Sequence, residues 1–435
     1  MYRPITHVSF VMTEECNLRC KYCFYKKNPK RTDWKTSKRL IDWLVEQGDN
    51  SERFHIQFFG GEPMLEWELI TRIIDYTKKY PQKQWAFGMT TNGTLFTEEK
   101  FQYCLDNRID ILFSIDGTPE AHDMHRVQVN EEGSFKLIEP WIERLAKSGI
   151  CDVARLTYTP DTLPMLYESI KYLKERGFKY VAPTPAIDSY RSFTKEDFEE
   201  WDRQYAKIAK DYKDTILSGT NPGANYFEKC WRQILIDQKL GGPCGAAKAF
   251  VGVSWDGGIY PCHRFVQWPE WRLGDVFTGI TNNKLREELL NYDINNPNHP
   301  NSKCAKCDNM FCGGTCLAAN YENNKSIYEP KEDGCILQKK QFDLAKELYD
   351  ELKDTEQFKR IYGKYKTENK QANNFQNNKQ KRIDLLTIDK RLENIEKMLF
   401  SLSKVVLDIA DKAILDNNNN KIERGNEHEQ ISYEK

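Results

Sequence analysis

Short apolar runs alternate with longer amphipathic stretches along the first half of the chain. Helical periodicity predicts helices at residues 36–48, 66–80, 97–106, 137–148 and 163–176. Between them, runs rich in β-branched and aromatic residues predict buried parallel strands at residues 7–13, 54–59, 85–91, 110–116, 153–159 and 179–185. This alternation predicts an α/β fold with a parallel, barrel-like or open sheet. Its chemistry is expected on loops at the carboxyl ends of the strands.

The pattern changes after the predicted sheet. A cysteine-rich, loop-rich stretch is typical of a small domain stabilised by metal rather than by a large apolar core. Near the end, apolar residues from Ile388 to Ala413 recur in steps of four and three, which predicts a coiled-coil helix. We expect six parts: a barrel domain at 1–190, a helical connector at 191–242, the cysteine-rich domain at 243–345, a helix and polar linker at 346–381, the coiled-coil helix at 382–415 and a disordered tail at 416–435.

Composition narrows the compartment and the partners. The formal net charge of the 435-residue chain is −1, so no overall basic field favours nucleic acid. The sequence contains no uninterrupted apolar run of membrane-spanning length, and its first residues lack the apolar run of a signal peptide. We therefore expect a cytoplasmic protein that binds neither nucleic acid nor membrane.

Thirteen cysteines in such a chain favour metal binding over disulfides, because a reducing cytosol keeps thiols free. Three of them, Cys104, Cys151 and Cys230, are scattered, and we expect them to be buried apolar side chains. The other ten fall into one group near the start of the chain and one group after residue 243.

The first group, Cys16, Cys20 and Cys23, directly follows the first predicted strand. Three thiolates can hold a [4Fe–4S] cluster and leave one of its four irons open for a small molecule. The alternative is a zinc site that takes a remote fourth ligand.

The spacing CxxxCxΦC, with Tyr22 as the aromatic residue, resembles the signature of the radical S-adenosylmethionine (SAM) superfamily. The resemblance implies a partial (β/α)₆ TIM-like barrel in which SAM binds the open iron and is cleaved reductively to a 5′-deoxyadenosyl radical. Asn92 and Asp116 have an alternative role as caps of turns before glycine. The resemblance also implies SAM contacts for the loop Gly60-Gly61-Glu62-Pro63, in which Glu62 engages the amino group, for the strand ends at Asn92, Ser114 and Asp116, and for Arg155, which reaches the carboxylate.

The second group resembles a SPASM domain, a family that usually holds two further [4Fe–4S] clusters. One spacing departs from the family pattern, because four residues rather than five separate Cys307 from Cys312. A pair of structural zinc sites is the alternative. The resemblance implies that one cluster is held by Cys304, Cys307, Cys312 and Cys335, and that a second, with one position open to substrate or filled by Cys230, is held by Cys244, Cys262 and Cys316.

Radical SAM/SPASM proteins mostly modify ribosomally made peptides. Relatives that make formylglycine carry an Asp directly after the cysteine that matches Cys262, whereas this chain has His263. The resemblance therefore favours thioether formation on a cysteine-containing precursor peptide, with Cys244, Cys262 and His263 as the catalytic candidates. His263 suits proton transfer because its side chain titrates near neutral pH.

Three alternatives stay open: carbon–carbon crosslinking, sulfatase-type maturation, and a non-catalytic iron–sulfur or zinc scaffold. We expect three [4Fe–4S] clusters and SAM as cofactors, and a flavodoxin- or ferredoxin-type electron donor. The helix at 382–415 is expected to serve self-association or to bind a partner helix.

Overall fold

The structure is a computed structural model that describes residues 4–48, 51–187, 190–222 and 227–362. Residues 1–363 form one compact unit. The predicted coiled coil at 382–415, the tail at 416–435 and most of the polar linker lie outside the described residues.

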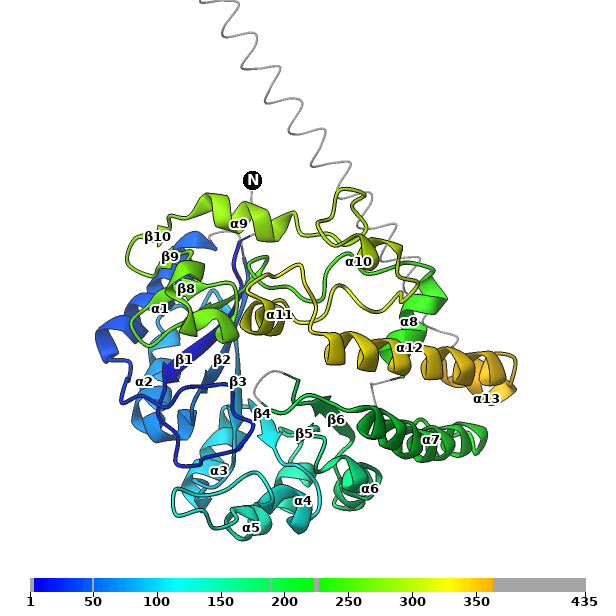
Figure 1. Ribbon diagram of the computed structural model, residues 1–435. Helices are drawn as coiled ribbons and strands as arrows, with labels where there is room; N and C mark the ends of the chain where they lie inside the picture. Colours follow the sequence, from blue (N-terminus) through cyan, green and yellow to red (C-terminus); the bar gives the residue numbers. More distant parts are fainter. Residues whose placement is uncertain (1–3, 49–50, 188–189, 223–226, 363–435) are drawn as a thin grey trace, which may run out of the picture. The chain divides into compact units, whose positions relative to one another are not determined.

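A ten-stranded sheet organises this unit, in the order β10-β9-β8-β7-β1-β2-β3-β4-β5-β6 (Figure 1). Neighbouring strands from β1 to β6 pair in parallel, and every residue of β1 after His7 is buried, as continuous apolar runs predict. The predicted parallel α/β sheet is confirmed. Its six predicted strands are β1 His7–Thr13, β2 Arg53–Gly60, β3 Gln84–Thr91, β4 Ile109–Ser114, β5 Val153–Tyr158 and β6 Tyr180–Pro185.

Helices follow these strands at the positions that the periodicity predicted. One short helix escaped prediction: α4, at Pro119–Asp123, begins where the Thr118 side chain accepts a hydrogen bond from the Ala121 N–H. Five residues are too few to show a helical period. The predicted helices are α1 Trp34–Gln47, α2 Trp67–Thr77, α3 Glu98–Asp106, α5 Phe135–Lys147 and α6 Leu166–Glu175.

The cysteine-rich segment contributes four further strands to the same sheet. Strand β7, Phe250–Val253, pairs in parallel with β1 on the side opposite β2. Short antiparallel pairings then add β8 Gly258–Tyr260, β9 Gly274–Asp275 and β10 Gly279–Ile280. Such short strands carry too few residues for period-2 patterning, which is why the sequence predicted only loops here.

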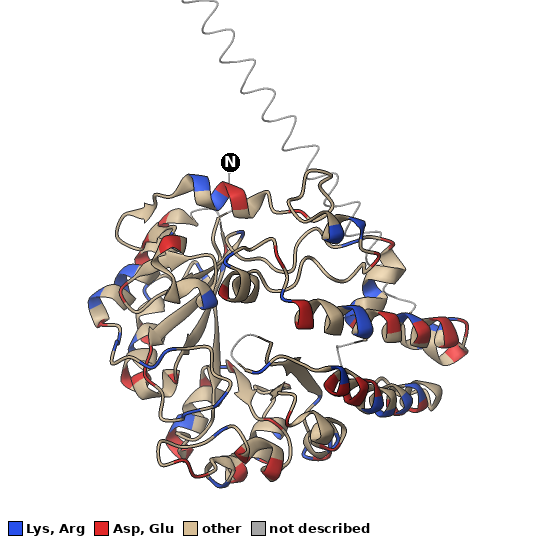
Figure 2. Cartoon of the chain, in the orientation of Figure 1, with Lys and Arg blue, Asp and Glu red and all other residues tan. Residues whose placement is uncertain are grey.

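The remaining helices follow β6 along the chain. Helices α7 and α12 are joined by ion pairs such as Lys340 to Asp202, at 2.7 Å, and both charge signs are mixed along them (Figure 2). No helix in the described ranges is both long and apolar enough to span a bilayer. These helices are α7 Lys195–Leu217, α8 Glu228–Ile236, α9 Asn283–Leu290, α10 Ser302–Lys306, α11 Leu317–Asn324, α12 Glu332–Leu352 and α13 Glu356–Tyr362.

Trp231 fastens this helical layer. Its side chain on α8 is 1% exposed, and the indole N–H donates to the Ala345 carbonyl at 2.6 Å. Ring contacts connect it to Tyr212 on α7 and to Phe358 and Tyr362 on α13, with centroids 5.2 to 5.7 Å apart. One aromatic side chain therefore joins α7, α8, α12 and α13.

Replacing Trp231 with alanine should lower the free energy of unfolding by about 3–5 kcal/mol, because the neighbouring helices cannot close the resulting cavity. Urea denaturation followed by circular dichroism measures this loss. Val129, which is 62% exposed, provides the control, and Val129→Ala should change stability by less than about 0.5 kcal/mol. Equal stabilities of the two variants would contradict the role given to Trp231.

Candidate active site

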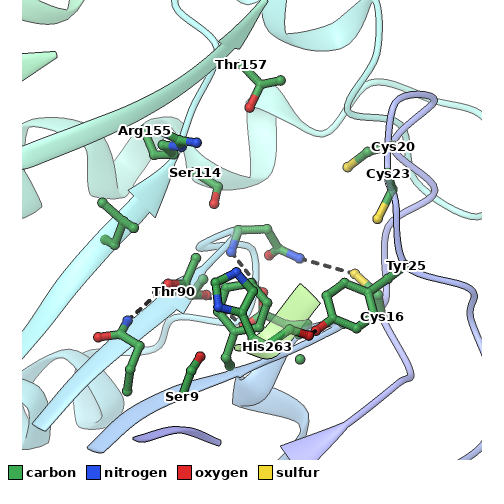
Figure 3. Close-up of a pocket in the computed structure, with 18 of the residues that line it drawn as sticks. Ser9, Cys16, Cys20, Cys23, Tyr25, Thr90, Ser114, Arg155, Thr157 and His263 are labelled. Carbon is green, nitrogen blue, oxygen red and sulfur yellow. Dashed lines mark hydrogen bonds between the residues drawn. The ribbon is translucent and has the colours of Figure 1, made fainter. Parts of the chain in front are cut away.

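A cavity of about 750 Å³ opens on the inner side of the sheet. Inward-facing residues of successive strands line it, among them Ser9 on β1, Thr90 on β3, and Arg155 and Thr157 on β5. The loop after β1 closes one side, so Cys16, Cys20 and Cys23 lie across the cavity from Ser114, Arg155 and Thr157 (Figure 3). The first cysteine group thus lines the cavity from the loop that directly follows β1.

Backbone hydrogen bonds hold the cysteine loop against a distant segment. The Arg19 N–H donates to the Val127 carbonyl at 2.7 Å, and the Lys21 N–H donates to the His125 carbonyl at 3.0 Å. This two-bond clamp fixes the loop on both sides of Cys20. The positions of the thiols therefore follow from the protein fold itself.

A buried ion pair reinforces the clamp. The Arg126 guanidinium donates to both Asp116 carboxylate oxygens, at 2.9 and 3.1 Å, and the Tyr22 hydroxyl donates to the same carboxylate. The Thr157 N–H adds a further bond at 2.9 Å. Arg126 also lies close enough to Cys20 to lower the pKa of that thiol, although burial, the larger effect, raises it to about 12.

These contacts alter the role expected for Asp116. Its carboxylate is fully occupied by protein donors, and neither Asp116 nor Pro63 lines the cavity. Asp116 thus positions Tyr22 and Arg126, and its expected contact with SAM stays a prediction. Sequence reasoning missed Arg126, because nothing in a chain of mixed charge marks one arginine as buried.

The loop after β2 approaches the cysteine loop too closely for any side chain. A Cβ atom on Gly60, whose φ is +149°, would lie 2.3 Å from the Thr13 carbonyl oxygen, and one on Gly61 would lie 2.0 Å from that of Glu15. The N–H groups of Gly61 and Glu62 donate to these two carbonyls at 2.8 and 2.9 Å. The glycines therefore allow the two loops to join.

Glu62 lies at the end of this contact and is 1% exposed. Its carboxylate accepts hydrogen bonds from the Met64 N–H at 3.0 Å, from the Thr91 hydroxyl at 2.8 Å and from the Asn92 N–H at 2.8 Å. Burial raises its pKa to about 7 in spite of these donors. A buried carboxylate on the cavity wall is suited to bind a cation such as an ammonium group.

Asn92 and Arg155 complete the predicted wall. The Asn92 side-chain amide donates to Asn17 at 3.0 Å and approaches the Cys16 sulfur at 3.8 Å. Arg155 lies half-buried opposite the cysteines, and burial together with nearby Arg126 lowers its pKa. A cation in this position favours an anionic ligand.

In the second half of the chain, cysteines of each predicted group lie close enough to influence the pKa values of one another. Burial raises the pKa of Cys262, and the neighbouring thiols of Cys316 and Cys244 raise it further. In the other group, burial and the thiols of Cys312, Cys335 and Cys307 raise the pKa of Cys304 to about 11. The ammonium of Lys239 donates to the carbonyls of Cys304, Ala305 and Cys307 at 3.0, 3.3 and 2.7 Å.

The three scattered cysteines behave as predicted. Cys104, Cys151 and Cys230 are each 0% exposed. The apolar packing role expected of these residues is confirmed.

His263 connects the cavity with Cys262, the residue before it. Its ring packs on Phe59 with a centroid distance of 4.3 Å, and the Tyr25 hydroxyl donates to its carbonyl at 2.6 Å. Burial and the nearby Arg155 cation lower the pKa of His263 to about 4. Its Nδ1 atom is buried and has no hydrogen-bond partner within the described residues. A neutral imidazole therefore borders the cavity.

Two further cations at this border were not singled out from the sequence. The Lys27 ammonium donates to the Cys23 sulfur at 2.8 Å. Arg264 lines the cavity, approaches the Cys316 sulfur at 3.9 Å and pairs with Glu322 at 3.0 Å. Of these two residues, the sequence could have indicated only Lys27, because it is one of several basic residues around the first cysteine group.

Residues 10–175 match the Radical SAM superfamily model. The chain carries a radical SAM domain. Over 319 residues it is 26% identical to the cysteine-type anaerobic sulfatase-maturating enzyme of Clostridium perfringens (strain 13 / Type A), a match that covers 69% of this chain and 85% of that enzyme.

Two solved structures share the fold of this chain. Native anSMEcpe with bound AdoMet and Cp18Cys peptide superposes with a TM-score of 0.65 at 22% identity, covering 79% of this chain and 99% of that chain. Streptococcus suis SuiB bound to precursor peptide SuiA gives 0.52 at 15% identity, with 76% of each chain covered.

A radical SAM domain implies a [4Fe–4S] cluster and SAM, and the residues present fit both. The cavity wall supplies three thiols, and no three Cys, His, Asp or Glu side chains of the described ranges are grouped as the ligands of a single metal ion would be. Three thiols can hold a four-iron cluster and leave one of its irons open for SAM. Glu62 and Arg155 offer opposite charges for the ammonium and carboxylate of SAM.

The raised pKa of Glu62 makes stability depend on pH. The folded chain retains this proton up to about pH 7, whereas a free glutamate loses it near 4.5. The stabilisation is therefore complete below pH 4.5 and lost as the pH rises through 7, a decrease of about 3 kcal/mol at 1.36 kcal/mol per pKa unit. Glu62→Gln should remove this component, measured as the difference in unfolding free energy between pH 5 and pH 8 without SAM.

The exposed Glu68 supplies the matched control for this measurement. Glu68→Gln changes the net charge equally and should leave the pH dependence of the wild type intact. A pH dependence that survives in Glu62→Gln would show that another group is responsible.

Proposed function

We propose that the protein modifies a peptide by radical chemistry, joining the sulfur of a peptide cysteine to a carbon atom of another residue. The observation that carries the proposal is the extent of the cavity. Its wall includes Cys16, Cys20 and Cys23 and continues to His263 and Arg264, which adjoin the cysteine group of Cys262. A peptide bound in this cavity would lie beside the first cysteine group and beside the group that includes Cys262.

Similar proteins support a peptide substrate. The sulfatase-maturating relative acts on a cysteine by its name, and the matching structures contain the Cp18Cys peptide and the precursor peptide SuiA. The cavity of about 750 Å³ is large enough for SAM and a peptide side chain together, since pockets for small molecules measure roughly 300–1,000 Å³.

Three [4Fe–4S] clusters would be held by the three cysteine groups. Cys16, Cys20 and Cys23 would hold the first, and the four cysteines from Cys304 to Cys335 the second. Cys244, Cys262 and Cys316 would hold the third, beside the substrate. When bound, the first cluster and SAM together supply a 5′-deoxyadenosyl radical that removes a hydrogen atom from the substrate.

The protein side chains orient SAM for that step. Glu62 pairs with the SAM ammonium group, while Arg155 on the opposite wall binds the carboxylate. Ser114 and Asn92 line the space between them. Tyr22, held by Asp116, closes the cavity above the cysteine loop and keeps water from it.

His263 is proposed to accept a hydrogen bond from the substrate rather than its proton, because a pKa of about 4 makes the neutral imidazole a weak base. Its Nδ1 atom has no partner in the described structure, and the tilted contact with the Phe59 ring, together with the hydrogen bond from Tyr25 to the His263 carbonyl, holds the residue in place. A substrate N–H, O–H or S–H group that reaches this nitrogen would donate to it.

Formylglycine formation is the second candidate, favoured by the 26% identity with a sulfatase-maturating enzyme. The residue after Cys262 distinguishes thioether formation from formylglycine formation. Relatives that form formylglycine carry an Asp at this position, whereas this chain has a neutral, buried His263. We therefore rank the thioether first.

The proposal predicts the product of anaerobic co-expression with a cysteine-containing peptide encoded beside the gene. The peptide should lose two hydrogen atoms for each crosslink, and its crosslinked cysteines should resist alkylation. Intact mass measurement before and after thiol alkylation tests this. Hydrogen loss with every thiol still alkylated would indicate carbon–carbon crosslinking, and an aldehyde that reacts with a hydrazide would indicate formylglycine.

Cys244→Ala should abolish crosslinking while 5′-deoxyadenosine is still formed, because the substitution affects the third cysteine group and leaves the first intact. Cys104→Ala, which removes a buried thiol outside every group, is the control and should retain both activities. Anaerobic assays with chromatography of the nucleoside and mass measurement of the peptide give both values. Crosslinking by Cys244→Ala would disprove the role of this group.

A further inference from the structure

The structure assigns a positioning role to Tyr292: its buried hydroxyl donates a hydrogen bond to a cysteine-ligated cluster at the junction of the two cysteine groups in the second half of the chain. This inference rests on the proposed function, because it requires that these groups hold clusters. Here the near group is Cys244, Cys262 and Cys316, and the far group is Cys304, Cys307, Cys312 and Cys335.

The ring of Tyr292 is held from two sides. It follows α9, is 6% exposed, and stacks on Tyr328 with centroids 5.6 Å apart and planes 16° apart. The His299 ring meets it edge-on at 5.4 Å. Because these two rings hold the ring of Tyr292, its hydroxyl oxygen has a fixed position.

The Tyr292 hydroxyl lies against the segment between Cys312 and Cys316, which joins the far group to the near group. A Cβ atom on Gly314, whose φ is +98°, would lie 2.1 Å from the Tyr292 hydroxyl oxygen. Gly314 lies midway between Cys312 of the far group and Cys316 of the near group. Only glycine leaves room for the hydroxyl here.

A second glycine contact brings the start of the near group to the same place. A Cβ atom on Gly313 would lie 2.0 Å from the carbonyl carbon of Gly242, two residues before Cys244. The Tyr292 ring also lies against Gly242, where an added Cβ would meet it at 3.5 Å. Tyr292 therefore borders both chain segments that carry the near and far cysteines.

The hydroxyl has no hydrogen-bond partner among the described residues, although it is buried. A buried hydroxyl without a partner is costly, so native structures rarely contain one unless a ligand completes it. Thiols of both groups lie in its surroundings: burial raises the pKa of Tyr292, and Cys304, Cys312 and Cys244 raise it further. A tyrosine hydroxyl can donate one hydrogen bond.

A donor at this position has a defined physical effect. Hydrogen bonds to cluster sulfurs stabilise the more negative, reduced state and so raise the reduction potential. Tyr292 would set the potential of the cluster that receives its hydrogen bond relative to its neighbour. It would not contact the peptide or SAM.

Tyr328 offers a matched control within the same stack. Its hydroxyl points away and donates to Glu288 at 3.0 Å. Tyr292→Phe and Tyr328→Phe each remove one oxygen and keep the stacked pair of rings. A difference between them therefore reports the direction of the hydroxyl rather than a general loss of packing.

The experiment uses the full chain, reconstituted anaerobically, with Cys16, Cys20 and Cys23 all replaced by alanine so that only the second-half groups can hold iron. This parent should contain roughly eight iron atoms per chain, four per cluster. Redox titration followed by electron paramagnetic resonance compares the parent with Tyr292→Phe and Tyr328→Phe.

We expect unchanged iron content in all three proteins and, in Tyr292→Phe alone, a shift of one cluster to a more negative potential with altered g values. Equal potentials and spectra in all three, with full iron, would overturn the role of Tyr292 and leave the proposed function intact. A parent without iron would overturn the auxiliary clusters and this role together, while 5′-deoxyadenosine formation by the unmodified chain would still report on the radical SAM site.

Discussion

The position of β1 between two parallel neighbours is the constraint on which the site depends. Phe10 at its centre is in register with Phe58 of β2 on one side and with Val253 of β7 on the other. Parallel strands end at the same edge, so the cysteine loop after β1 meets the glycine loop after β2. The hairpin of β7 and β8 then turns the chain back along β7, and the segment after β8 brings His263 into contact with Phe59. Two cysteine-bearing regions far apart in the sequence become neighbours because they flank one buried strand.

The cysteine loop itself is held by polar contacts rather than by apolar packing. Backbone bonds from Arg19 and Lys21 attach it to residues 125–127, and the buried pair of Asp116 and Arg126 holds Tyr22. Removing one partner of such a pair leaves a buried charge and is strongly destabilising, whereas the intact pair contributes little net stability. Its value lies in fixing where the thiols stand before any ligand binds. A site arranged in advance avoids the cost of ordering a flexible loop around a cofactor.

In the second half of the chain, glycines allow the cysteine-bearing segments to approach one another closely. Between Cys312 and Cys316, Gly313 and Gly314 allow the backbone of residue 242 and the hydroxyl of Tyr292 to approach within distances that no side chain permits. Small domains with little apolar core gain stability when metal sites join their loops. Here the close contacts also bring thiols of different groups near a single tyrosine. Packing, ligand placement and the environment of the clusters therefore depend on the same few residues.

Periodicity alone predicted the six parallel strands and the main barrel helices, because long buried runs leave a clear pattern. Cysteine spacing likewise separated the ten grouped thiols from the buried ones such as Cys104. The sequence did not predict that β7 would join the sheet, because a four-residue strand carries no distinctive period. Nor did it show that the Asp116 carboxylate accepts hydrogen bonds from Arg126, or that the Tyr292 hydroxyl lies against Gly314. Local sequence records which residues favour strand, helix or metal, whereas contacts between distant residues, and hence burial and hydrogen-bond partners, exist only once the chain is folded.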